Sequence, residues 1–149
     1  MITCLEDQLR RDESERQYAY DDANGKTLVR GTQLRGNLTI GVGRNLSAKG
    51  ISPKEQDFLL ANDIADATAD LQAKLPWTAT LDDVRKGAMV NMTFNIGIGG
   101  LLEFHDFLAR MQRGDFSGAA GAMLDSLWAR QVGARATRLS IQIQSGVWQ

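Results

Sequence analysis

The apolar residues change their spacing along the chain, and this change restricts the fold more than any other feature of the sequence. Over residues 17–44 they alternate with polar residues, and turn signals rich in glycine and asparagine interrupt the alternation. Beyond Ser52 they recur with the spacing of one helical face. Alternation is typical of half-buried strands, whereas the second spacing is typical of amphipathic helices. The sequence therefore predicts an α+β fold, mostly helical, with a small antiparallel sheet.

A long helix is predicted directly after the sheet. Ser52 and Glu55 have the spacing of a capping box, and Pro53 lies at the first helical position, where its missing N–H group is tolerated. Pro76 then interrupts the pattern, so the helix should cover residues 53–75. Its predicted apolar stripe consists of Phe58, Leu59, Ala61, Ile64, Ala65, Thr68 and Leu71.

Beyond Pro76 the pattern is helical almost throughout. Thr80, with Asp83 three residues later, is predicted to cap a helix whose apolar run reaches Ile98. Because that run is apolar on nearly every side, we expect a buried central helix. Gly114 and Gly133 are predicted to separate the shorter helices that follow.

A short amphipathic helix is predicted at the start of the chain. Thr3 and Glu6 have the spacing of a capping box, and Leu5, Leu9 and Glu13 then recur at helical spacing. We expect these three side chains to share the face that turns inward.

The predicted elements form a single domain of residues 1–149. Its sheet lobe covers about residues 14–52, and the connecting helix covers about 53–75. The helical lobe covers about 77–149 and also receives residues 1–13.

Composition and charge argue against several classes of protein. With one cysteine, Cys4, and one histidine, His105, we expect no disulfide, no metal site and no cofactor. The 17 basic residues are interleaved with 18 acidic ones, so no strong field favours nucleic acid or anionic lipid. The first residues lack the apolar stretch of an export signal or membrane helix, so we expect cytoplasmic folding without stable membrane insertion.

Glu13 is a candidate general acid. It lies near the carboxyl end of the first predicted helix and on its partly apolar face, and both surroundings favour a protonated carboxyl group. Arg10, Arg11 and Arg16 would oppose this effect if they approached the carboxyl group. The alternative is a solvated surface glutamate, since most glutamates are exposed.

Asp22 and Thr39 are candidate partners of that acid. Asp22 begins the turn 22–25, where an aspartate either caps the turn or offers a carboxylate that activates water. Thr39 is either an ordinary strand residue or part of a glycine-rich face that a ligand can approach closely. Asp21 should face the other side of its strand.

Two asparagines interrupt the apolar run of the central helix. Asn91 and Asn95 lie four residues apart, so they project from one face and need hydrogen-bond partners if they are buried. They either serve the core or line a groove.

Several segments can be compared with a known family as a set. They are LRRDE at 9–13, AYDDANGK at 19–26, LTIGVGRNL at 38–46, NMTFNIG at 91–97, and SLWARQVGARATRL with SGVW near the end. Together they resemble the bacteriophage lysozymes of glycoside hydrolase family 24 along nearly the whole chain. The resemblance implies a lysozyme fold with a cleft between its two lobes.

The resemblance also implies roles for single residues. The family's acid, the aspartate nine residues beyond it and the threonine that opens the TIG strand correspond to Glu13, Asp22 and Thr39. The implied supporting residues are a late arginine that reaches the catalytic glutamate and two residues of the groove or core, here Arg135, Phe94 and Asn91.

The implied activity is that of an inverting muramidase, which hydrolyses the β-1,4 bond between N-acetylmuramic acid and N-acetylglucosamine in peptidoglycan. The implied role is that of an endolysin that causes host lysis. We expect a monomer that stays in the host cytoplasm until a holin-type membrane protein lets it reach the glycan strands of the wall in the periplasm. The alternatives are a non-catalytic peptidoglycan-binding module and a lytic transglycosylase, which forms an anhydro sugar.

The sequence departs from the family pattern at two places. The stretch TLVRGTQLRGN at 27–37 is longer than its counterpart, so the hairpin tip should be longer. Arg44 follows the TIGVG segment where the pattern has a histidine, so we expect different scaffolding around it.

Overall fold

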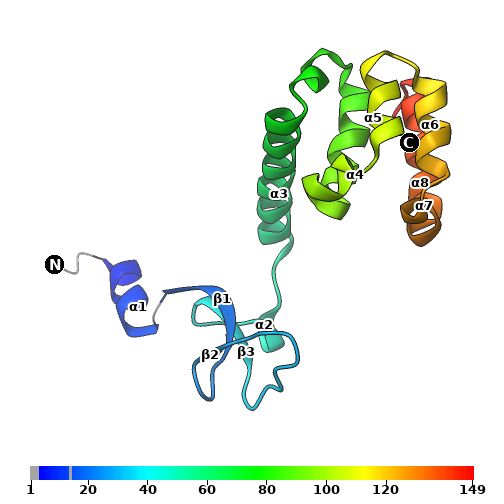
Figure 1. Cartoon of the computed structure of the whole chain (residues 1–149). Coiled ribbons are helices and arrows are strands. Elements are labelled where there is room, and N and C mark those ends of the chain that lie inside the picture. Colours follow the sequence, from blue (N-terminus) through cyan, green and yellow to red (C-terminus); the bar gives the residue numbers. More distant parts are fainter. Residues whose placement is uncertain (1–3, 14) are drawn as a thin grey trace. The chain divides into compact units, whose positions relative to one another are not determined.

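The computed structural model describes residues 4–13 and 15–149. The chain divides into two compact units, residues 1–57 and residues 58–149, and each is described by itself. In Figure 1 the first unit contains the strands, and the second contains most of the helices.

The first unit is built around a small sheet. Its helices are α1 (Leu5–Glu13) and α2 (Leu46–Lys49), and its strands are β1 (Glu15–Asp21), β2 (Lys26–Thr27), β3 (Leu38–Val42) and β4 (Arg44–Asn45). The strands lie in the order β2-β1-β3-β4, and every neighbouring pair is antiparallel. This arrangement confirms the predicted α+β class and the small antiparallel sheet.

The central pair, β1 and β3, sets the positions of the residues around the hairpin. Tyr20 lies opposite Thr39, and the register shifts between Arg16 and Tyr20. Between these two positions, residues 17–19 of β1 lie opposite Ile40 of β3 alone, so β1 carries two extra residues there. Tyr20 and Thr39 are both buried, at 8% and 3% exposure.

Arg44 fixes the connection from the sheet to the next helix. Its guanidinium group donates to both carboxylate oxygens of Glu55, at 2.9 and 2.8 Å, and to the carbonyl oxygen of Gly50. Planar guanidinium and carboxylate groups make such paired bonds well. Arg44 therefore serves as scaffolding for the start of the long helix.

The long helix α3 (Pro53–Lys74) begins and ends as its sequence predicts. The N–H group of Ser52 donates to the Glu55 carboxylate, and the Ser52 hydroxyl accepts from the Glu55 N–H group, as in a capping box. The 3₁₀ helix η1 (Pro76–Thr80) follows it. The division between the two units falls within α3, after Asp57.

The second unit is helical. After η1 it contains α4 (Asp83–Leu102), α5 (His105–Gln112), α6 (Phe116–Leu124), α7 (Leu127–Val132) and α8 (Ala134–Ser145). The helix α6 packs against α5 and α8, and Figure 1 shows these three side by side. Gly114 and Gly133 have positive φ angles of 79° and 55° between helices, as their predicted role requires.

One apolar core holds the second unit together. Its fully buried members are rich in methionine, a flexible side chain that fills irregular gaps. The members are Leu71, Ala88, Met89, Met92, Leu101, Phe107, Met111, Ala119, Met123, Trp128, Ala129, Ala136, Leu139 and Ile143. The buried side of α4 lies in this core, as predicted for a central helix.

Three details of the helices differ from the sequence predictions. The cap of α4 is Asp82, whose carboxylate accepts from the Arg85 N–H group, because Thr80 instead belongs to η1 and donates its hydroxyl to the Trp77 carbonyl. Gly97, with φ 72° and ψ 162°, interrupts α4. In the predicted stripe of α3, Phe58, Leu59 and Ile64 are exposed, and only Leu71 joins the core.

The first helix has no buried residue. Leu5 and Leu9 are 67% and 44% exposed, so the described residues of the first unit do not cover the predicted inward face of α1. Thr3, the first half of the predicted capping box, lies outside the described residues. That residues 1–13 belong with the helical lobe stays a prediction. No helix in the described ranges combines the length and the apolar character needed to cross a membrane.

Candidate functional site

Asp22 and Thr39 meet at one residue of the hairpin, Asn37. The Asp22 carboxylate accepts two bonds from Asn37, one from its N–H group (2.7 Å) and one from its side-chain amide (2.9 Å). The carbonyl oxygen of Asn37 accepts in return from the Asp22 N–H group (3.2 Å) and from the Thr39 hydroxyl (3.3 Å). The structure thus brings these two predicted site residues together.

Glu13 lies at the other end of the strand that carries Thr39. It is the last residue of α1, and α1 contacts β3. A Cβ atom built on Gly43, just beyond β3, would stand 2.7 Å from Oε2 of Glu13. A larger residue would require the Glu13 carboxylate to move, and the φ of 63° at position 43 also favours glycine. At Gly43, the Glu13 side chain therefore lies on the glycine-rich face that is predicted to be open to a ligand.

The arginines near Glu13 are engaged elsewhere. Arg10 forms an ion pair with Glu15 (2.7 Å), and Arg11 forms one with Asp12 (2.6 Å). Arg16 lies over the ring of Tyr20, 4.4 Å from its centroid, and donates to the Gly25 carbonyl.

The Glu13 side chain is exposed and forms no hydrogen bond or ion pair with the described residues of its unit. The first unit thus provides no buried surroundings for Glu13, but it leaves the carboxyl group free for a substrate.

The turn-capping role that the sequence allowed for Asp22 belongs to Asp21. The Asp21 side chain is 1% exposed and accepts from the N–H groups of Ala23 (3.0 Å), Arg35 (2.8 Å) and Gly36 (2.9 Å). The N–H group of Arg35 does most to lower the pKa of Asp21, and burial of the carboxylate opposes it. Asp22 is exposed, so its carboxylate can reach a ligand.

The three supporting residues lie together in the second unit. The Asn91 side-chain oxygen accepts from Nε (2.9 Å) and from one terminal nitrogen (2.6 Å) of Arg135. Asn91, Phe94 and Arg135 line a pocket of about 320 Å³ with Trp148, whose ring packs on Gly87 so closely that a Cβ atom would overlap it. Asn91 is exposed and lines this pocket; that the pocket is a substrate groove stays a prediction. That Arg135 reaches Glu13 stays a prediction.

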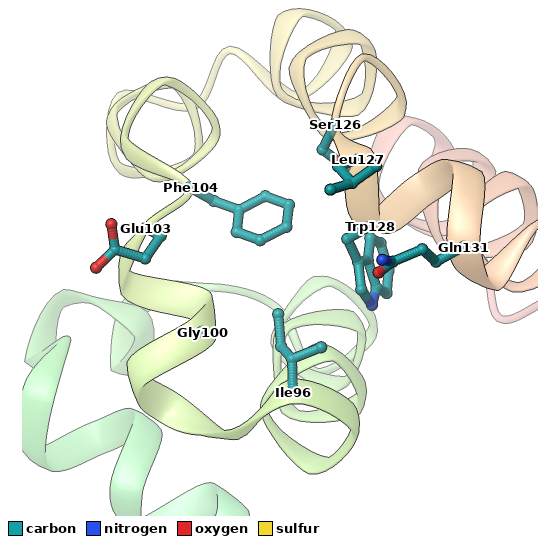
Figure 2. Close-up of a pocket in the computed structure, with 8 residues that line it drawn as sticks. All are labelled: Ile96, Gly100, Glu103, Phe104, Ser126, Leu127, Trp128 and Gln131. Atoms are coloured by element: carbon teal, nitrogen blue, oxygen red, sulfur yellow. The ribbon is translucent and has the colours of Figure 1, made fainter.

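A second pocket, of about 380 Å³, opens on another face of the helical unit. Figure 2 shows Ile96 and the ring of Phe104 directed into it, with Trp128 and Gln131 on the opposite wall. The Trp128 ring N–H donates to the side chain of Asn95 (2.8 Å), so Asn95 finds its partner at this pocket. The lining is mainly apolar, and none of the predicted site residues belongs to it.

Sequence reasoning missed two residues of the hairpin. Asn37 is absent from the predicted site, although it contacts both Asp22 and Thr39, and Asp21 is predicted only to face away from Asp22. Asp21 is buried and Asp22 is exposed, but strand alternation does not indicate that Asp21 binds the 35–37 turn. The residues Arg35-Gly36-Asn37 are typical of a turn, but nothing in them indicates that the turn binds Asp21 and Asp22.

The described residues contain no group of three histidine, cysteine, aspartate or glutamate side chains placed to hold a metal ion. The first unit presents two exposed carboxyl groups, those of Glu13 and Asp22, near the two ends of β3.

Comparison with known proteins assigns most of the chain to one family. The family described as phage lysozyme matches residues 11–141. The pre-baseplate central spike protein Gp5 of Enterobacteria phage T4 is 31% identical over 159 residues, covering 95% of this chain but 28% of that protein. The probable T4-type lysozyme 1 of Dictyostelium discoideum is 26% identical over 165 residues, covering 98% of this chain and 96% of that protein.

The chain thus spans less than a third of the spike protein but nearly all of the slime-mould relative. The family match includes the three predicted site residues of the first unit, Glu13, Asp22 and Thr39, and the three supporting residues of the helical unit. The fold, with a small antiparallel sheet and a helical unit, agrees with it. The chain belongs to the phage lysozyme family, and its function is lysozyme-like.

Proposed function

We propose that this protein is a muramidase that hydrolyses the β-1,4 bond between N-acetylmuramic acid and N-acetylglucosamine in peptidoglycan. The observation that carries the proposal is the arrangement along β3. Asp22 and Thr39 share the Asn37 carbonyl at one end of the strand, and Glu13 lies against Gly43 at the other end. Two carboxyl groups that flank a bond are the usual machinery of glycoside hydrolysis.

In the proposed reaction, Glu13 donates its proton to the glycosidic oxygen while the bond from that oxygen to the anomeric carbon breaks. Asp22 accepts a proton from a water molecule that bonds to the anomeric carbon from the opposite face, and the Thr39 hydroxyl helps to orient that water. The product therefore has the inverted configuration. This route requires a separation of roughly 6.5–9.5 Å between the two carboxyl groups when substrate is bound.

The helical unit would supply binding and charge. Arg135 is held by Asn91, and no carboxylate of the described residues pairs with it, so its guanidinium group is available. We propose that it faces Glu13 in the working enzyme and that Phe94 and Asn91 line the substrate groove beside it. No cofactor is needed for this chemistry.

The test is mass analysis of the fragments that the protein releases from purified peptidoglycan. Hydrolysis adds one water to each broken linkage, and Glu13→Gln should lower the rate about 100-fold or more. Glu15→Gln is the matched control, because Glu15 is a neighbouring exposed glutamate that pairs with Arg10. The control should stay within about twofold of the parent.

Three other results would overturn the proposal. Fragments lighter by one water would identify a lytic transglycosylase. Binding of peptidoglycan without any release would identify a binding module. An early product with the retained anomer, followed by NMR, would contradict inversion.

For the biological role, we propose an endolysin that acts as a monomer. It would stay in the host cytoplasm until a holin-type membrane protein opens the inner membrane, and it would then reach the wall in the periplasm. Expression in bacteria should leave the culture intact until the membrane is permeabilised with chloroform, and the culture should then clear. Clearing without permeabilisation would contradict this role.

The similarity to the phage T4 spike protein favours a second role for the same chemistry. In that role the chain would be carried by a phage particle and would open the wall during entry. Detection of the chain in purified particles would favour this role, whereas its presence only in the soluble fraction of infected cells would favour the endolysin.

A further inference from the structure

The inserted hairpin segment 27–37 ends at the residue that holds Asp22. Asn37 binds both carboxylate oxygens of Asp22, at 2.7 and 2.9 Å, and both donors are polar N–H groups. Asp22 is exposed, and an exposed aspartate with no such partner samples several rotamers. Two bonds to an ionised group on one side chain fix both the rotamer and the plane of the carboxylate. The remaining lone pairs of the two oxygens stay available for a water molecule.

Asn37 controls Thr39 through a different atom. Its carbonyl oxygen accepts from the Thr39 hydroxyl (3.3 Å) and also from the backbone of Asp22 (3.2 Å). A shift of Asn37 would therefore move the carboxylate and the hydroxyl together. Two groups that must orient one water molecule are thus tied to one residue.

The turn that carries Asn37 is tied to a buried charge. Asp21 accepts from the N–H groups of Arg35 and Gly36, the two residues before Asn37, and from the side-chain amide of Asn24 (3.1 Å). The pKa of Asp21 is lowered, mainly by the Arg35 N–H group, so the anchor is ionised at neutral pH. Leaving these donors without an acceptor in a buried place is unfavourable, so the turn should stay where Asp21 holds it.

The turn also packs closely on residues 21–23. A Cβ atom on Gly36 would overlap Oδ1 of Asp22 and would stand 2.8 Å from the backbone nitrogen of Ala23. The absence of a side chain at Gly36 lets residues 35–37 lie directly on residues 21–23. The hydrogen bonds and the packing therefore specify one geometry.

We propose that Asn37 is a positioning residue that orients the Asp22 carboxylate and the Thr39 hydroxyl, and that buried Asp21 holds the 35–37 turn so that Asn37 can do this. The inference rests on the proposed function, since it assigns Asp22 a role in the reaction. It names two residues outside the predicted site, and one of them lies in the segment where this chain departs from the family pattern.

The test is steady-state release of reducing ends from soluble peptidoglycan fragments. Asn37→Ala should lower kcat about 10- to 100-fold, the range expected for loss of an orienting bond to a charged group, while KM changes less than about twofold. Thr32→Ala is the control. Thr32 lies in the same segment 27–37 and its hydroxyl accepts from the Val29 N–H group, but it bonds neither Asp21 nor Asp22. It should lower kcat less than about threefold.

A double-mutant cycle tests the link to Asp21. Asp21→Asn should lower kcat about tenfold, because the turn is released and Asn37 is no longer held. Combined with Asn37→Ala, it should lower kcat by no more than about twofold beyond the worse single variant, since both changes act through one element. Asn37→Ser retains a short hydroxyl donor and should recover part of the activity lost in Asn37→Ala.

The outcomes separate this inference from the proposed function. If the parent releases no reducing ends, both proposals fall. If the parent is active but Asn37→Ala keeps its kcat within about twofold, the role of Asn37 is overturned and the proposed function stands. Equal losses in Asn37→Ala and Thr32→Ala, or multiplicative effects of Asp21→Asn and Asn37→Ala, would also overturn it. Circular dichroism of each variant establishes that it is folded.

Discussion

The helical unit and the sheet unit are held together by different interactions. In the helical unit, fourteen buried residues form one apolar core around Met89, Met92 and Phe107. Among residues 4–13 and 15–57, the buried apolar side chain is that of Tyr20, and the buried polar ones are Asp21 and Thr39. The sheet unit relies on hydrogen bonds to a buried carboxylate where the helical unit relies on apolar contact.

The two kinds of interaction suit different tasks, because apolar contact stabilises a unit whereas hydrogen bonds orient its side chains. Apolar burial is non-directional and tolerates small movements, so it suits a unit that has to stay folded. Hydrogen bonds depend on distance and angle, so they suit a hairpin that has to orient a carboxylate and a hydroxyl. Core substitutions should therefore affect mainly unfolding, whereas hairpin substitutions should affect mainly turnover.

The largest effect is expected in the apolar core. Phe107→Ala removes a ring that is 1% exposed, and it should lower the free energy of unfolding by about 3–5 kcal/mol in urea titrations. Leu127→Ala, at a leucine that is 62% exposed, is the control and should change it by about 0.5 kcal/mol or less. Equal effects of the two changes on the free energy of unfolding would contradict the idea that apolar burial stabilises the helical unit.

A smaller loss is expected from overpacking the hairpin. Gly36→Ala puts a methyl group onto Asp22 and Ala23, and it should lower the free energy of unfolding by roughly 1–3 kcal/mol. The release of peptidoglycan fragments should fall with it, because the Asp22 carboxylate must move. An active variant of unchanged stability would contradict the close packing at this turn.

The charge at Asp21 should make the hairpin depend on pH. The folded-state pKa of Asp21 is lowered below its ordinary value of 3.8, so its contribution to stability is present above that value and is lost as the pH falls through the folded pKa. The Tm difference between the parent and Asp21→Asn should therefore be full at neutral pH and should shrink in acid. A difference that stays constant down to about pH 2 would count against the buried anchor.

The smallest effect is a gain in the helical unit. Gly121 lies inside α6, and a Cβ atom there would meet nothing within 4 Å. Gly121→Ala should raise the free energy of unfolding by about 0.5–1 kcal/mol, because alanine favours the helix, and it should leave turnover unchanged. Paired with Gly36→Ala, it applies the same chemical change to both units with opposite expected signs.

Much of the helical unit was predictable from sequence because periodicity and caps act over a few residues. The capping box of Ser52 and Glu55 and the stop at Pro76 gave the bounds of α3 within one residue. The cap of α4 was wrong by two residues, since Thr80 and Asp82 both precede plausible helical starts and only the course of η1 decides between them. The break at Gly97 had no local signal that distinguishes it from a glycine inside a helix.

The hairpin was less predictable because its contacts join residues that are far apart in sequence. The sequence predicts Glu13 and Asp22 as the acids, but the bonds from Arg35 and Gly36 to Asp21 depend on how the lengthened segment 27–37 folds back. Contacts between residues so far apart in sequence can be assigned only when the backbone path is known.

The inserted segment has a fixed base and a free tip, which makes it a natural site for grafting. Its base is held where the N–H group of Leu28 donates to the Ala19 carbonyl (2.9 Å) and where Asp21 accepts from Arg35 and Gly36. Between these points Val29 and Leu34 are exposed, so peptides of other lengths can replace residues 29–34 without disturbing the base. A library diversified at this tip would vary what the hairpin touches while keeping the Asp22 carboxylate, the proposed base, in place.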